Sequence, residues 1–166
     1  MLSVSEAINQ LVASTKPATA AESLSVLDSL GRILAADICA EVDVPPADNS
    51  AMDGYAFCYA EAAANGFQLP LSQRVAAGTA PLPMASNTVA RIFTGAEIPL
   101  GADTVAMQEN CTEQNGIVAV DAAVKANGNV RPRGQDIQAS QIILTTGTKI
   151  SAQEMGLLSS IGIAVV

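Results

Sequence analysis

The sequence contains no histidine and no tryptophan, and aromatic residues make up only 3% of its 166 positions. Without histidine the chain by itself can form no Ser-His-Asp triad, no thiol–imidazole pair and no standard zinc site. Because aromatic side chains are scarce, a hydrophobic core has to be built from Val, Ile, Leu and Ala. A chain of roughly this length buries about 70% of its unfolded surface, so such a core is feasible.

Basic residues are also few, with 8 Lys and Arg against 16 Asp and Glu, which gives a formal charge of −8. An acidic chain repels the phosphates of nucleic acids and anionic lipids, and this excludes both as general partners. The same field opposes an anionic small molecule. A site for an oxyanion or a pterin phosphate therefore has to draw on local arginines, helix N-termini, a cation or another domain.

Cysteine is sparse, and Cys39, Cys58 and Cys111 show no CxxC spacing. We expect these to be buried, unreactive thiols. Long apolar runs are missing as well, since none approaches 18 residues, and Met1 leads directly into the polar stretch 3–6. We therefore expect no membrane span, no signal peptide and a cytoplasmic location.

Helical patterns lie at the two ends of the chain. Ser3 followed by Glu6 is a capping-box pattern that predicts a helix over 4–14, and Ser151 with Glu154 predicts another that ends at Gly162. A short helical pattern covers 26–30 and precedes Gly31. Residues 33–44 alternate in polarity and predict an extended segment, and 164–166 read as the start of a strand, at which point the chain looks cut.

The middle of the chain is rich in proline and glycine and predicts short strands. The candidates are 55–57, 71–75, 88–93, 104–108, 116–120 and, later, 142–144, with a helical turn at 59–64 and a surface loop at 76–87. Their spacing favours small antiparallel sheets over βαβ units. The predicted class is α+β and β-rich, an elongated fragment in two parts. One domain would comprise 1–44 and 131–166, and the other would be an inserted β-rich domain of 45–130.

The most unusual segment is Pro45-Pro46-Ala47-Asp48-Asn49-Ser50-Ala51-Met52-Asp53-Gly54-Tyr55-Ala56. Its prolines rule out a central strand or a helix interior at the start, and Asp48, Asn49 and Ser50 favour turns. Asp-Gly is a strong turn dipeptide. From local chemistry alone, the segment is either a rigid loop closing into a hairpin or a functional loop in which the Asp53 carboxylate ligates Mg²⁺.

This segment resembles the Asp-Asn-Ser-Ala-Met-Asp-Gly-Tyr-Ala signature of the molybdopterin molybdenumtransferase family, the MoeA and gephyrin E-domain proteins. Two further stretches, 91–109 (beginning Arg-Ile-Phe-Thr-Gly-Ala) and 129–137 (Asn-Val-Arg-Pro-Arg-Gly-Gln-Asp-Ile), are similar to the same family. The similarity extends over nearly the whole chain. It implies the N-terminal and linker region only, since full-length relatives continue into a larger pterin-binding domain and a small C-terminal domain.

The resemblance implies an enzyme that inserts molybdate into adenylylated molybdopterin with Mg²⁺ and release of AMP, in an elongated homodimer whose active-site cleft lies between subunits. It implies active-site positions for Asp53 and Thr94. The local alternative for Thr94-Gly95 is a strand end followed by a bulge. Asn49 and Ser50 either bond a ligand or hold the loop in shape.

Arg131, Arg133 and Asp136 form the third candidate set. Two arginines on either side of Pro132 can point the same way along an extended chain and match the geometry of phosphate or an oxyanion. The alternative is an internal salt bridge from Arg133 to Asp136. Gln135 stands where relatives often carry Glu, so it is left out of the set, and Ala47 replaces an aromatic residue.

We therefore predict a catalytic set of Asp53, Thr94 and Asp136 and a substrate-binding set of Asn49, Ser50, Arg131 and Arg133, with the metal ligand undefined. The isolated chain would be inactive, because the missing domains of the other subunit complete the site. The alternative function is a non-catalytic dimerisation or scaffold module.

Overall fold

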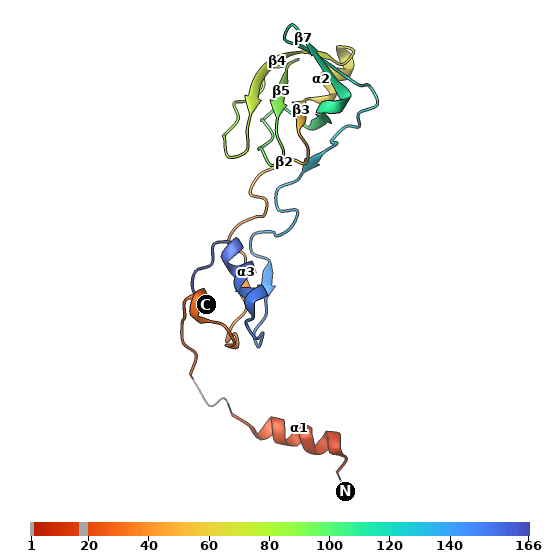
Figure 1. Cartoon of the computed structure of the whole chain (residues 1–166). Helices are drawn as coiled ribbons and strands as arrows, with labels where there is room; N and C mark the ends of the chain where they lie inside the picture. The colour runs from red at the N-terminus through yellow and green to blue at the C-terminus, as the bar shows by residue number, and fades with distance from the viewer. Residues whose placement is uncertain (1, 17–19) are drawn as a thin grey trace. The chain divides into compact units, whose positions relative to one another are not determined.

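The structure, a computed structural model, describes residues 2–16 and 20–166. Their helical elements are α1 (Val4–Ser14), α2 (Tyr59–Ala64) and α3 (Ala152–Ser160), with short 3-10 turns η1 (Val26–Asp28) and η2 (Gln108–Asn110), as Figure 1 shows. Both predicted capping boxes are present, Ser3 with Glu6 and Ser151 with Glu154, and each opens the helix predicted for it.

The strands are short, as the turn residues predict, and confirm a β-rich mixed fold. They are β1 (Ile38–Cys39), β2 (Asn49–Ser50), β3 (Gly54–Phe57), β4 (Gln68–Val75), β5 (Val89–Ile92), β6 (Thr104–Met107), β7 (Cys111–Gln114), β8 (Ile117–Val120), β9 (Val130–Arg131) and β10 (Ile142–Leu144).

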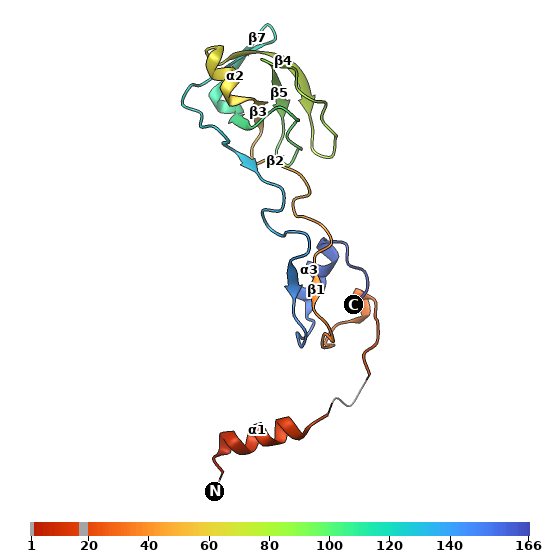
Figure 2. The ribbon, with the colours of Figure 1, turned by 180° about the vertical axis from the view of Figure 1, so that it is seen from behind.

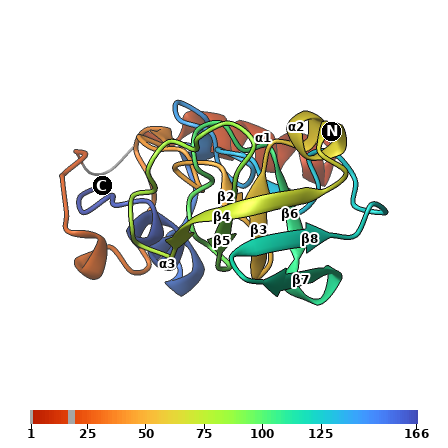
Figure 3. The same ribbon diagram turned by 90° about the horizontal axis from the view of Figure 1, so that it is seen from above.

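Six of these strands form one sheet in the order β6-β3-β5-β4-β8-β7 (Figure 3). The pairs β1-β10 and β2-β9 form two small sheets. Within the large sheet β4 and β5 run parallel, whereas its other pairs are antiparallel. The parallel pair was not predicted. It is possible because the loop between the two strands, residues 76–88, is long enough for a crossover.

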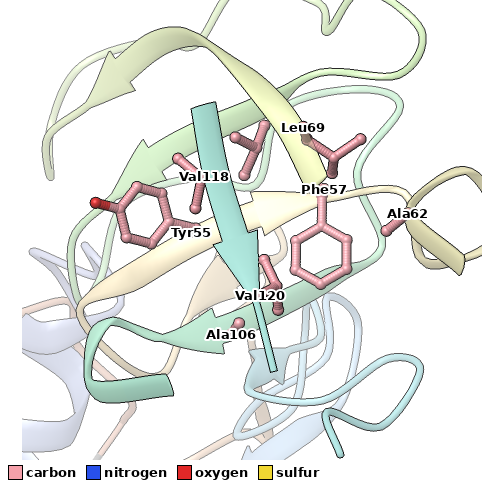
Figure 4. Close-up of a cluster of buried hydrophobic side chains, with 8 residues drawn as sticks. Tyr55, Phe57, Ala62, Leu69, Ala106, Val118 and Val120 are labelled. Carbon is pink, nitrogen blue, oxygen red and sulfur yellow. The ribbon is translucent and has the colours of Figure 1, made fainter. Parts of the chain in front are cut away.

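β3 pairs with β6 on one side and β5 on the other, and all four of its residues are buried. Alternate residues of β3 enter different clusters: Tyr55 and Phe57 pack with Val118 and their neighbours, while Ala56 packs with Val75 and Ile92 on the other face. Figure 4 shows the first cluster around the fully buried Phe57 ring. The expectation of an aliphatic core is met except for this ring and Tyr55.

Internal contacts divide the chain into two units, one of residues 1–38 and 144–166 and the other of residues 39–143. The large sheet and both of its hydrophobic clusters belong to the second unit. The first unit contains α1, η1 and α3, and it buries Val26, Leu34, Ile150, Leu158 and Ile161. Figure 2 shows α3 and β1 from behind.

The extended segment predicted over 33–44 forms only in part. Ile38 and Cys39 make a strand, and Ile33 and Val44 make isolated bridges to two different partners, Lys149 and Ile137. Cys39 is exposed, so the prediction of buried thiols is wrong at this position, while Cys58 and Cys111 are half-buried. Burial raises the pKa of the Cys111 thiol to about 11, which keeps it protonated and unreactive.

No helix within residues 2–16 and 20–166 combines the length and the apolar character that crossing a membrane requires.

Candidate active site

Asp53 is held in place by Thr94. Its Oδ1 accepts two hydrogen bonds of 2.8 Å, one from the backbone N–H of Thr94 and one from the Thr94 hydroxyl. The backbone bond, followed by the hydroxyl bond, lowers the pKa of the Asp53 carboxyl; desolvation opposes this effect and the nearby Arg91 guanidinium adds to it. Asp53 is thus an exposed carboxylate fixed through one oxygen.

The register of the large sheet brings these two residues together. Gly54 on β3 lies opposite Ile92 on β5. Asp53 and Thr94 lie just beyond this pair, and therefore meet where the two paired strands end. Gly54 is the first residue of β3, and a Cβ at this position would lie 1.9 Å from the carbonyl oxygen of Ala106 on the neighbouring strand β6. The Asp-Gly pair is therefore not a hairpin turn, and the glycine is required by the close approach of β6.

The loop 48–53 is bonded to the segment that follows Thr94. Ser50 N–H donates to the Ala96 carbonyl at 2.9 Å, and Gly95 N–H donates to the Ser50 carbonyl at 2.8 Å. Asn49 forms a bridge with Glu97. The first two segments quoted for the family resemblance thus lie against each other in residues 39–143.

The third segment joins the same loop through strand pairing. β2 pairs antiparallel with β9, with Asn49 opposite Arg131 and Ser50 opposite Val130. Ala51 N–H also donates to the Asn129 carbonyl at 2.9 Å. All three segments therefore converge, although they are separated by tens of residues in the sequence. Their convergence makes a shared site geometrically feasible.

Arg133 forms an ion pair, but its partner is not Asp136. Its Nε lies 2.5 Å from Oδ2 of Asp43, and its backbone N–H donates to Oδ1 of Asp48 at 2.7 Å. The backbone N–H of Ala139, followed by Arg133, lowers the pKa of the Asp43 carboxyl. Asp43 therefore partly neutralises the guanidinium that we predicted to contact an anion.

The other predicted residues differ in what they offer. The Ser50 hydroxyl is buried and donates to the Met52 carbonyl at 2.6 Å, so it holds the loop in shape. Oδ1 of Asn49 is buried without a hydrogen-bond partner in the described residues. Arg131 and Asp136 are exposed, and within residues 2–16 and 20–166 their side chains make no hydrogen bond to the protein. Their roles stay predictions.

A cavity of about 290 Å³ lies beside the converging loops. Its lining is Pro46, Ala47, Asn49, Gly78, Thr79, Ala80, Gly95 and Glu97. The loop 76–87, which the sequence marks only as surface, thus contributes to a hollow next to the signature loop. Small residues leave this space open, and its polar groups include a carboxylate and an amide.

Arg74, Arg91 and Phe93 were not predicted as site residues. Phe93 immediately precedes Thr94 in the chain. The guanidinium carbon of Arg91 lies 4.6 Å from the centroid of the Phe93 ring, and that of Arg74 lies 4.7 Å from the same centroid. The alternation of Arg91 and Phe93 along a predicted strand places them on one face. That β4 brings Arg74 alongside depends on the unpredicted parallel pair.

The described residues contain no group of three or more Asp, Glu, His or Cys side chains that could hold a metal ion. They fit Mg²⁺ only in the mode in which one or two carboxylates bind it together with water and substrate phosphate. Asp53 suits that mode, because Thr94 occupies only Oδ1.

Strand-rich architecture, a long insertion between two terminal segments and three converging polar loops define the class of this chain. It matches the model of the MoeA N-terminal region (domains I and II) over residues 2–162, and the chain belongs to this family.

Individual relatives belong to the same family. The molybdopterin molybdenumtransferase of Haemophilus influenzae is 32% identical over 99% of this chain and 41% of its own length. That of Nostoc sp. is 37% identical over 78% of this chain and 31% of its own length. The crystal structure of the molybdopterin biosynthesis MoeA protein from Pyrococcus horikoshii superposes with a TM-score of 0.87 at 30% identity, over 95% of this chain and 41% of that one. The chain thus spans about two fifths of its relatives' length.

Proposed function

We propose that this chain supplies one half of the active site of a molybdopterin molybdenumtransferase, which inserts molybdate into adenylylated molybdopterin. The observation that carries the proposal is the convergence of the three family segments around the Asp53–Thr94 pair. Relatives that carry the transferase name match almost the whole chain. Asp53, Thr94 and Asp136 would act in catalysis, and Asn49, Ser50, Arg131 and Arg133 in substrate binding.

The protein residues would mainly hold pterin, oxyanion and metal in register. Mg²⁺, when bound, would neutralise phosphate charge, with Asp53 as the protein ligand best placed to meet it. The rest of the site would come from domains outside this chain, contributed by the other subunit of a homodimer in the cytoplasm. The chain alone would then be inactive.

The test joins this chain to the remainder of the Haemophilus influenzae relative and measures AMP release from adenylylated molybdopterin in the presence of molybdate and Mg²⁺. We expect turnover by the joined protein, its loss in Asp53→Asn, and no change in Asp28→Asn, which makes the same substitution at an exposed position in the other unit. Titration of the joined protein with Mg²⁺ and pterin would show whether Asp53→Asn or Asp136→Asn removes metal binding.

The isolated chain is the second arm of the test. Turnover by the 166-residue chain alone would refute the division of the site between domains. A joined protein that is inactive, but dimerises through this chain, would favour the alternative of a scaffold module.

A further inference from the structure

Two arginines stack on one aromatic ring at the edge of the candidate site. Their guanidinium carbons lie 4.7 Å (Arg74) and 4.6 Å (Arg91) from the centroid of the Phe93 ring. Because both distances end at the same point, the two cations are closer than the roughly 10 Å over which 0.1 M salt screens charge. Like charges at this separation repel each other, although each gains from the ring.

Neither arginine is neutralised by an ion pair in residues 2–16 and 20–166. The contacts of Arg91 go to neutral groups: Nη1 donates to the carbonyls of Gly54 at 2.7 Å and Ile92 at 3.2 Å, and Nη2 donates to Oε1 of Gln108 at 2.5 Å. A guanidinium has five N–H donors, so donors remain free. Arg74 is exposed, and none of the side-chain hydrogen bonds of the described residues involves it.

This arrangement is unusual in a chain of formal charge −8 with only 8 basic residues, since carboxylates are abundant and yet none in the described residues forms an ion pair with either arginine. Arg91 does act on Asp53, but Thr94 already binds that carboxylate through Oδ1. Sheet register fixes the pair, with Arg74 on β4 alongside Arg91 on β5. The two planar guanidinium groups are therefore preorganised, and neither forms an ion pair within the part of the chain that the structure describes.

We propose that Arg74 and Arg91, held by the Phe93 ring, bind a tetrahedral oxyanion of the substrates next to Asp53 and Thr94. This ligand class rests on the proposed function, in which either molybdate or the phosphate of the adenylylated pterin could supply the oxyanion. The pair would give an acidic chain the local positive site that anion binding requires. It also differs from Arg131 and Arg133, the arginines that the sequence indicated.

The test titrates the 166-residue chain at low ionic strength with sodium molybdate in one arm and with AMP in the other, by calorimetry and by NMR of the Phe93 and Thr94 amides. We expect binding of at least one anion, with shifts at those amides and weakening by added salt. Arg74→Gln should weaken binding by about fivefold or more, the factor for loss of ~1 kcal/mol at an exposed charged contact. The arm that responds identifies the source of the oxyanion.

Lys149→Gln is the matched control, because it removes one exposed positive charge from the other unit. It should change affinity by less than about twofold, because it leaves both guanidinium groups on the Phe93 ring in place. Arg74→Lys keeps the charge but not the planar fork and should lie between wild type and Arg74→Gln. Phe93→Leu leaves both charges but removes the ring on which both guanidinium groups stack, and should also weaken binding.

Equal affinities in Arg74→Gln, Lys149→Gln and wild type would overturn the proposal, as would the absence of binding in both arms. These results are separable from those of the transferase assay. A joined protein that turns over while Arg74→Gln binds anions normally would refute this site alone. Anion binding that depends on Arg74, in a joined protein without turnover, would refute the transferase instead.

Discussion

The two units of the chain contain the same local device, an aspartate held by a threonine. Oδ1 of Asp37 accepts bonds from the backbone N–H of Thr146 at 2.7 Å and its hydroxyl at 2.8 Å. Asp53 and Thr94 repeat this geometry with two bonds of 2.8 Å. In both pairs the backbone bond is the main cause that lowers the aspartate pKa. A threonine that donates two hydrogen bonds to an aspartate therefore joins two chain segments, and this arrangement by itself does not indicate a catalytic residue.

What distinguishes Asp53 is its surroundings. Arg91 contributes to its lowered pKa, whereas no charged group does so at Asp37. Asp53 also stands on a sheet with buried clusters on both faces, while Asp37 precedes the two-residue strand β1. A buried sheet and the nearby Arg91 thus make Asp53 a candidate site residue, whereas Asp37 only joins two chain segments.

Among the substitutions considered, Gly54→Ala should lower the free energy of unfolding most, because it disrupts the packing of β3, the strand that follows Asp53. The new Cβ would lie 1.9 Å from the backbone oxygen of Ala106, so β3 and β6 have to separate. We expect a loss of about 4 kcal/mol or more in the free energy of unfolding, measured by urea denaturation.

Gly156→Ala is the matched control in the other unit. Gly156 lies inside α3 with nothing within 4 Å of an added Cβ. Alanine should therefore stabilise the chain by about 0.5–1 kcal/mol, because it is the better helix former. If both substitutions had the same sign, the close approach of β6 would not explain the glycine at 54.

Phe57→Ala should have the next largest effect, about 3–5 kcal/mol, because it empties the centre of the first cluster. The chain has only two tyrosines and no tryptophan, and Tyr55 and Tyr59 both lie in the unit of residues 39–143. Tyrosine fluorescence therefore reports the unfolding of that unit. Leu158→Ala, at a buried position of α3, should shift the helical circular dichroism signal and leave the fluorescence transition in place. Equal shifts in both signals would show that the units unfold together.

The parts of the fold that depend on neighbouring residues could be predicted from the sequence. Ser3 with Glu6, and Ser151 with Glu154, define helix starts within four residues, and both helices begin there. β7 was missed because it is a polar, largely exposed strand without an apolar alternation to indicate it. The parallel β4–β5 pair was missed because strand order depends on contacts that local pattern does not encode.

The site shows the same limit. Asp53 and Thr94 could be indicated through the family resemblance, and their mutual bond was unforeseen because it spans 41 residues. Asp37 and Thr146 had no motif, and their separation of 109 residues hid them. Arg74 and Arg91 are ordinary strand residues until the register places them on one ring.

A smaller effect is expected from Thr94→Val and Thr146→Val, which remove one hydroxyl donor each and keep the backbone N–H. The pKa of Asp53 should rise in the first variant and that of Asp37 in the second, each toward its ordinary value and only in part. Carboxyl-carbon NMR titration measures both. A rise of the Asp53 pKa in Thr146→Val would contradict the assignment of partners.

The same pKa shifts set the sign of the pH dependence. Each aspartate has a folded pKa below its unfolded value of about 3.9, so its stabilising contribution is complete above that pH and is lost as pH falls through the folded pKa. Both valine variants should therefore lose less stability on acidification than wild type. In the transferase assay, only Thr94→Val should reduce turnover, because Asp37 has no role in the proposed site.

Salt should have the smallest effect on the pKa values of the two aspartates. It tests the one cause of the lowered pKa that they do not share, the charge of Arg91 near Asp53. The hydrogen bonds from threonine act at contact distance and are screened little, whereas the attraction between Asp53 and Arg91 acts over a longer range. At 1 M salt, where the screening length is about 3 Å, the Asp53 pKa should rise relative to that of Asp37. Arg91→Gln should raise it similarly at low salt and remove the salt response. If salt changed the pKa of both aspartates equally, Arg91 would not distinguish them. The Asp53–Thr94 pair would then differ from the Asp37–Thr146 pair only in the buried sheet on which it lies.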